Sequence, residues 1–162
     1  MTFMEGVVHY GDKVSKARSF VNDNRIETCM KKMGVSKDEL KYLIDINDSK
    51  LSVLSFAIAR FIMPGRVSCS SYAAVVSRLM DYAGVEDYQI IAGFCLPKDG
   101  INYKHDREVF DRLKEVETHP VTATHVFIYY NKKYYECFNG SVDNIDHIDC
   151  VDVYSRVKFS PD

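Results

Sequence analysis

The chain has 162 residues, the size of one ordinary domain, which is long enough to bury a hydrophobic core without disulfides or a structural metal. Hydrophobic residues make up 46% and charged residues 27%, a composition typical of globular proteins. The net charge of -2 lacks the basic excess that nucleic acids and anionic membranes attract, so we expect neither as a partner.

The five cysteines, at positions 29, 69, 95, 137 and 150, are odd in number and widely spaced, and none forms a C-x-x-C pair. This spacing argues against a zinc site or a redox dithiol and favours reduced thiols. The first residues carry no basic start followed by a long apolar run, and the apolar stretch 53–64 is too short to span a bilayer. We therefore expect a cytoplasmic protein.

The first 64 residues are expected to be mainly helical. A capping box from Ser36 to Glu39 predicts a short helix over about 37–44. The segment 48–65 is apolar on nearly all sides and closes with Pro64 and Gly65, which predicts a buried helix.

The next helix is expected to begin at Cys69, with Ser68 as its N-cap. Apolar residues recur at three- and four-residue steps, and Gly84 is a natural residue to follow the helix end. Segment 88–96 then reads as a strand. Residues 98–119 are charged and ambiguous, and predict a loop with one short helix around 106–116.

The clearest hairpin of the sequence lies at 124–140, where two β-branched and aromatic runs flank a polar turn from Asn131 to Lys133. The tail at 142–159 is expected to add one more strand. Because the helices come first and the strands later, the chain is expected to be α+β rather than an alternating parallel fold.

Cys69 is the cysteine best placed for chemistry. The unpaired amides and the dipole of a helix N-terminus lower the pKa of a nearby thiol, and the same amides can hold an oxyanion. The other four cysteines lie in predicted helix or strand interiors or near the tail. The alternative is that Cys69 is a small buried hydrophobe, which is the commoner role of a lone intracellular cysteine.

His125, at the start of the hairpin, is the candidate base. A three-residue turn pairs Tyr130 with Tyr134 and therefore sets His125 opposite Asn139, within reach of its imidazole. An Asn that orients a His beside a Cys is a known triad variant. Among the other histidines, His147 has three aspartates nearby, and a solvated acidic turn is a better reading there than a metal site.

Segments 69–94 and 124–140 resemble the core of the transglutaminase-like superfamily, within the broader papain-like fold. The family pattern has a nucleophilic Cys that opens a helix, followed three and four residues later by an aromatic and a small residue, here Cys69, Tyr72 and Ala73. Its helix-ending turn matches 83–85, its next strand matches 90–94, and its H-x-aromatic strand matches 125–127. Fourteen residues after the His, where the family usually has Asp, this chain has Asn139.

The resemblance implies a papain/transglutaminase-like core, in which the nucleophile helix packs on an antiparallel sheet. The whole chain, 1–162, would be one domain, with a helical N-terminal part at 1–64 and a catalytic core at 65–162. Cys69 would be the nucleophile, His125 the general base and Asn139 the orienting residue, with the Cys69 amide as one oxyanion donor. No cofactor or metal is implied, and the substrate would be a protein or peptide.

The reaction implied by the resemblance is attack on an amide carbonyl to form a thioester acyl-enzyme, followed by transfer to water or an amine. Peptidase, amidase, transglutaminase and deamidase activities therefore stay open. A second possibility is a catalytically silent module of the same fold, which docks a protein partner through residues 1–64. A third is a plain globular domain in which Cys69, His125 and Asn139 are not neighbours.

Overall fold

The computed structural model describes residues 2–65, 67–114, 123–137, 145–153 and 158–159. In these segments the chain forms six helices and five strands, mostly helices first and strands later, so the α+β prediction is confirmed. The elements are α1 (Phe3–Phe20), α2 (Asp23–Met33), α3 (Lys37–Ile46), α4 (Ser49–Ile62), α5 (Cys69–Tyr82), β1 (Gln89–Pro97), α6 (Tyr103–Lys114), β2 (His125–Tyr130), β3 (Lys133–Tyr135), β4 (Ile145–Asp152) and β5 (Lys158–Phe159).

The first five helices begin at side-chain caps that the sequence encodes. Each cap side chain accepts a hydrogen bond from a backbone amide in the first turn, which satisfies a donor that has no partner inside the helix. The N-cap residues are Thr2, Asn22, Ser36, Asp48 and Ser68. The predicted starts of α3, α4 and α5 are therefore confirmed.

α4 differs from its prediction as a helix buried on nearly all sides. Its buried residues lie on one face, whereas the side chains of Val53 and Phe61 are 62% and 54% exposed. The apolar composition of this helix thus supplies both a core face and an exposed apolar face.

The sheet has the strand order β3-β2-β1-β4-β5, and all neighbouring strands run antiparallel. Gly93 of β1 pairs with His125 on one side and with Cys150 on the other. A Cβ at position 93 would meet Cys150 Sγ at 2.7 Å, so the close approach of β4 requires a glycine there. The register of β1 with β4 shifts directly after Gly93, which places Cys95 opposite His147.

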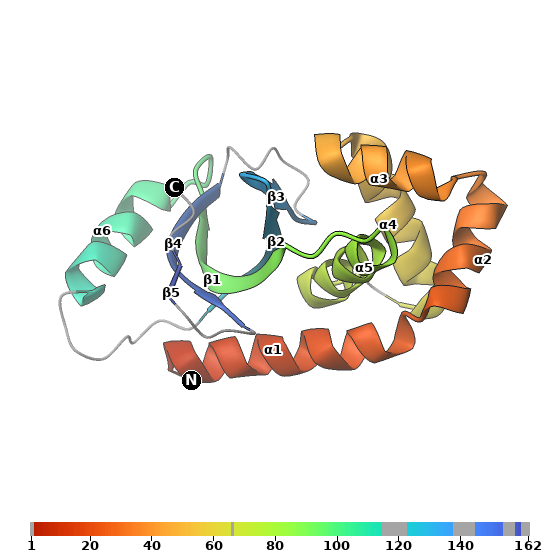
Figure 1. Cartoon of the computed structure of the whole chain (residues 1–162). Coiled ribbons are helices and arrows are strands. Elements are labelled where there is room, and N and C mark those ends of the chain that lie inside the picture. The colour runs from red at the N-terminus through yellow and green to blue at the C-terminus, as the bar shows by residue number, and fades with distance from the viewer. Residues whose placement is uncertain (1, 66, 115–122, 138–144, 154–157, 160–162) are drawn as a thin grey trace.

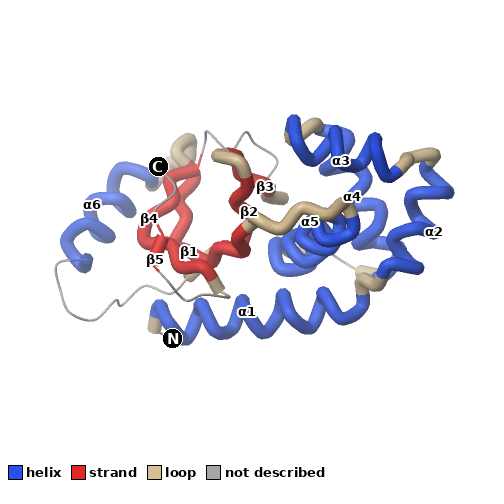
Figure 2. The backbone as a smooth tube through the Cα atoms, viewed as in Figure 1, coloured by secondary structure: helices blue, strands red, loops and turns tan. Residues whose placement is uncertain are grey.

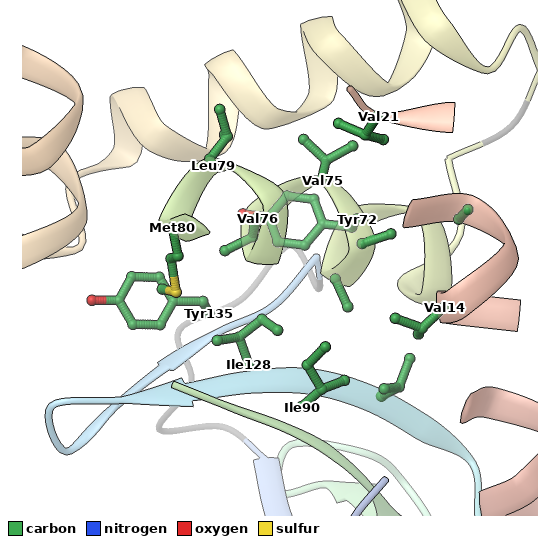
Figure 3. Close-up of a cluster of buried hydrophobic side chains, with 14 of the residues drawn as sticks. Val14, Val21, Tyr72, Val75, Val76, Leu79, Met80, Ile90, Ile128 and Tyr135 are labelled. Atoms are coloured by element: carbon green, nitrogen blue, oxygen red, sulfur yellow. The ribbon is translucent and has the colours of Figure 1, made fainter. Parts of the chain in front are cut away.

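The sheet lies between the α6 helix and the group α1–α5 (Figures 1 and 2). On one side, Val76 and Met80 of α5 pack towards Ile90 and Ile128 of the sheet and Tyr135 of β3 (Figure 3). These residues are fully or almost fully buried and belong to one continuous core. The core therefore joins α5, the helix that begins at Cys69, to the antiparallel sheet.

α6 packs on the same face of the sheet farther along β1, where Phe110 stacks on Phe94 with ring centroids 5.1 Å apart. The α6 helix (Tyr103–Lys114) was expected a few residues later, around 106–116. The C-terminal segment contributes two strands, β4 and β5, rather than the single strand predicted.

Within the described ranges, we find no helix with both the length and the apolar character needed to cross a membrane.

Candidate active site

Cys69 is the first residue of α5, and its side chain is half-buried. Ser68 caps the helix: its hydroxyl accepts the Ser71 amide, and its carbonyl accepts the first intrahelical hydrogen bond, from Tyr72. The amides of Cys69 and Ser70 precede these bonds and have no acceptor within the helix. The cap thus leaves two backbone donors beside the thiol.

His125, the first residue of β2, is 1% exposed and is hydrogen-bonded to the Cys69 thiol. Burial alone would raise the pKa of Cys69, but the hydrogen bond and charge of His125, with a hydrogen bond from the Val126 backbone, outweigh it and lower this pKa. Burial alone would lower the pKa of His125, but the hydrogen bonds with Cys69 and Glu136 raise it. Both shifts favour a thiolate beside an imidazolium.

Glu136 is the third member of the group, and it is not among the site residues predicted from the sequence. Its Oε2 lies 3.4 Å from His125 Nε2, and both side chains are only 2% exposed. Because Nε2 faces the carboxylate, the other ring nitrogen, Nδ1, is the one available to the thiol. A buried carboxylate in this position fixes the orientation of the imidazole and stabilises its charged form.

The turn of the hairpin explains why Glu136 faces His125. The turn has two residues, Asn131 and Lys132, both in the left-handed region with φ of 50° and 60°, as two-residue hairpins favour. Tyr130 therefore pairs with Lys133, and the predicted pairing with Tyr134 is wrong. One step beyond the last pair, this register sets Glu136 opposite Phe127, whose side chain lies on the same sheet face as that of His125.

Asn139, the predicted orienting residue, lies outside the described residues. Its expected position opposite His125 depended on a three-residue turn, and the turn has two residues. The structure thus brings together Cys69 and His125, as expected, and adds Glu136. A two-residue reading of the turn would have placed Glu136 on the His125 face from the sequence alone.

His147 lies in β4, so the prediction of a solvated acidic turn is wrong. Its ring stacks on Phe127 at 4.4 Å, and Phe127 in turn stacks on His125 at 5.9 Å. His147 Nδ1 also lies 3.3 Å from Cys95 Sγ. In the described part of the chain, no group of three or more His, Cys, Asp or Glu side chains is arranged to hold a metal ion.

Three other cysteines have pKa values shifted in the opposite direction from that of Cys69. Burial raises the pKa of Cys29 and raises that of Cys95 well above its ordinary value. Burial, with the nearby Cys69, raises the pKa of Cys137 to about 11. Cys69 is thus set apart from these thiols by its partner His125.

No family model matches the chain, and comparisons with curated proteins and with solved structures also find no match. The function of this protein is therefore inferred from the geometry and electrostatics of this site.

Proposed function

We propose that this protein is a cysteine-nucleophile hydrolase or acyltransferase that acts on an amide bond of a protein or peptide. The observation that carries the proposal is the contact of Cys69 with His125, which is itself paired with the buried Glu136. A thiol that only filled space would need neither a buried imidazole nor a buried carboxylate, because each costs free energy to desolvate.

In the proposed mechanism, the Cys69 thiolate attacks the carbonyl carbon of the substrate, and a C–S bond forms as the carbonyl oxygen becomes an oxyanion. The amides of Cys69 and Ser70 are placed to stabilise this charge. The imidazolium of His125 then donates its proton to the leaving amine, and the C–N bond breaks. Water or a second amine, deprotonated by His125, attacks the thioester and releases the thiolate.

We assign the orienting role to Glu136, which holds the charged imidazole through Nε2. This replaces Asn139 in the set suggested by the resemblance to the transglutaminase-like superfamily. A carboxylate in this role supports the proposal as well as an amide does, because both types of side chain orient the imidazole of known triads.

The first experiment is alkylation of the folded protein with limiting iodoacetamide at pH 6, with each cysteine mapped by mass spectrometry. We expect Cys69 to be labelled at least about tenfold faster than Cys137, since an ordinary thiol is almost wholly protonated at that pH. His125→Ala should abolish the difference. Equal labelling of both cysteines in the wild type would contradict the proposal.

A second assay separates hydrolysis from transfer. The protein is incubated with casein, as a generic glutamine-bearing protein, and a fluorescent primary amine. Incorporation of the amine that requires Cys69 indicates an acyltransferase, whereas new amino termini without incorporation indicate a peptidase.

The exposed apolar face of the helical part favours a second candidate, an interaction module. Phe61 of α4 and Met33 of α2 are 54% and 41% exposed, and both line a hollow between these helices together with Cys29 and Ala57. A Cys69→Ala protein that keeps the full cellular effect would favour the module over the enzyme.

A further inference from the structure

Helices α2 and α4 pack against each other at the end of the molecule farthest from α6 (Figure 1). Val53, Ala57 and Phe61 follow one another at four-residue steps along α4, and such residues share one face of a helix. Val53 and Phe61 are 62% and 54% exposed, and Met33 at the end of α2 is 41% exposed. These residues form an apolar stripe about 12 Å long, given a rise of 1.5 Å per residue. Exposed apolar side chains gathered in this way mark interaction sites.

Two hollows lie along the stripe, and Met33 lines both of them. The first hollow, beside Ala57 and Phe61, has a volume of about 160 Å³. The second hollow, beside Val53, lies between α2, α3 and α4 and has a volume of about 180 Å³. Both are close in size to an apolar cavity of about 150 Å³ that binds benzene in another protein. Each hollow therefore has room for one apolar or aromatic side chain.

The charges beside the stripe are mainly positive. Lys32 Nζ lies 4.6 Å from the centroid of the Phe61 ring, and Arg60 is the exposed residue directly before Phe61. In the described segments of the chain, neither Lys32 nor Arg60 has a carboxylate partner. At the second hollow, Lys50 is paired with Glu39 at 3.4 Å. The surface thus carries an excess of positive charge, although the whole chain has a net charge of -2.

We propose that this α2–α4 surface binds an amphipathic helix of a partner protein, which presents apolar side chains flanked by carboxylates. Two side chains seven residues apart on a helix are separated by about 10.5 Å, close to the length of the stripe. Carboxylates beside them would neutralise Lys32 and Arg60. The proposal gives a partner chemistry to the second candidate function and does not rest on catalysis at Cys69.

Two other occupants fit this surface less well. A second copy of the chain, bound through the same surface about a two-fold axis, would set Lys32 and Arg60 against the same cations of its partner. Like charges placed together in this way disfavour association. A lipid bilayer has no separate side chains to enter the two hollows, and helices that bind membranes carry a strongly basic polar face.

The test uses two designed peptides of about 16 residues, long enough for about four helical turns. The acidic peptide carries Leu at positions i, i+4 and i+7 with Glu and Ala elsewhere, and the basic peptide has Lys in place of every Glu. Both carry fluorescein, and fluorescence anisotropy measures their affinity for the full-length protein. We expect the acidic peptide to bind at least about tenfold more tightly than the basic peptide.

Two substitutions at exposed side chains separate the apolar and the charged parts of the surface. Phe61→Ser should weaken binding of the acidic peptide at least about tenfold, as expected for an aromatic residue at the centre of an interface. Its control is Tyr42→Ser on α3, at a residue that is 61% exposed. Lys32→Glu should weaken binding about threefold to tenfold at low salt, and the loss should shrink in 1 M salt, where charges are screened beyond about 3 Å. Its control is Lys13→Glu, at an exposed residue of α1.

Any of three results would overturn the proposal: no binding of the acidic peptide, equal binding of both peptides, or equal affinity of Phe61→Ser and Tyr42→Ser for the acidic peptide. Binding to phosphatidylserine vesicles that Phe61→Ser abolishes would assign the surface to a membrane instead. A dimer in sedimentation experiments that Phe61→Ser dissociates would assign it to a second copy of the chain. Alkylation of Cys69 tests the enzymatic proposal separately, so the failure of one leaves the other standing.

Discussion

Glu136 and His125 form an ion pair in which Oε2 lies 3.4 Å from Nε2 and each side chain is 2% exposed. Such a buried pair joins the imidazole to a fixed negative charge and keeps water away from it. Loss of one partner leaves the other desolvated without compensation, so substitutions at this pair should have large effects.

We expect Glu136→Gln to lower the reactivity of Cys69 at pH 6 by about tenfold or more, the equivalent of one pKa unit. The carboxylate helps to raise the pKa of His125, so its loss lowers the fraction of imidazolium that stabilises the thiolate. The rate of alkylation at Cys69 measures the effect. Glu86→Gln, at an exposed loop residue, is the matched control and should change nothing. Equal rates in the two variants would remove Glu136 from the site.

The pH profile of alkylation should separate two half-buried thiols. Since the pKa of Cys69 is lowered from 9.0, its rate should rise with pH through a midpoint below 9.0. The rate at Cys137 should rise only towards a midpoint of about 11. In His125→Ala, burial is the strongest remaining influence on Cys69, so its midpoint should move above 9.0. A midpoint that stays in place would show that His125 does not activate the thiol.

Two glycine substitutions should have opposite effects on stability. A Cβ at Gly93 would meet Cys150 Sγ at 2.7 Å, so Gly93→Ala should lower the free energy of unfolding by about 1–3 kcal/mol. A Cβ at Gly11, inside α1, meets only Val153 at an ordinary 3.7 Å, so Gly11→Ala should stabilise by up to about 1 kcal/mol. Urea unfolding followed by circular dichroism measures both. Equal stabilities would contradict the close packing of β1 on β4.

Arg18 ties α1 to α5, because its guanidinium bonds to Ser77 and, at 2.9 Å, to Asp81. Arg18→Ala should lower the free energy of unfolding by about 1.5–3 kcal/mol, the range for hydrogen bonds to charged groups, and the partial exposure of the pair favours the lower end. Lys13→Ala, at an exposed residue of the same helix, is the control. A loss no larger than that of the control would show that the bridge is not a structural tie.

Much of the fold could be predicted because its signals are local. Ser68 and Gly84 mark the two ends of the α5 region through hydrogen-bonding and conformational preferences of single residues, and both predictions are confirmed. Cys69 could be placed at a helix start for the same reason. The start of β2 at His125 follows from the β-branched and aromatic run after it.

The error at the turn has an equally specific cause. Two-residue hairpin turns can usually be recognised in a sequence by a glycine, which adopts positive φ at no steric cost. Here Lys132 takes that conformation, with φ of 60°, and nothing in its identity predicts it. Because side chains on a strand alternate between faces, the error of one residue in the predicted register placed Glu136 on the face away from His125.

The environment of His147 was predicted wrongly for a different reason. Its acidic neighbourhood looked like a solvated turn, but Asp146 accepts hydrogen bonds from Tyr103 and Arg107 of α6. Those partners stand 43 and 39 residues away in the sequence, so the local pattern could not show that the charge is neutralised in the fold.

α3 contributes no residue to the proposed active site, yet three hydrogen bonds near its end hold β3, and one of them joins the Lys133 ammonium to the Asp45 carbonyl. The Tyr135 hydroxyl donates to the Ile44 carbonyl, and Asn47 Nδ2 donates to the Tyr134 carbonyl. Together these hydrogen bonds fix the register of β3 against β2. A shift of one residue in that register would turn the Glu136 side chain away from His125 and place a neighbouring side chain there instead. Removal of the Asn47 side chain would then lower the enzymatic activity in the same way as removal of the Glu136 carboxylate.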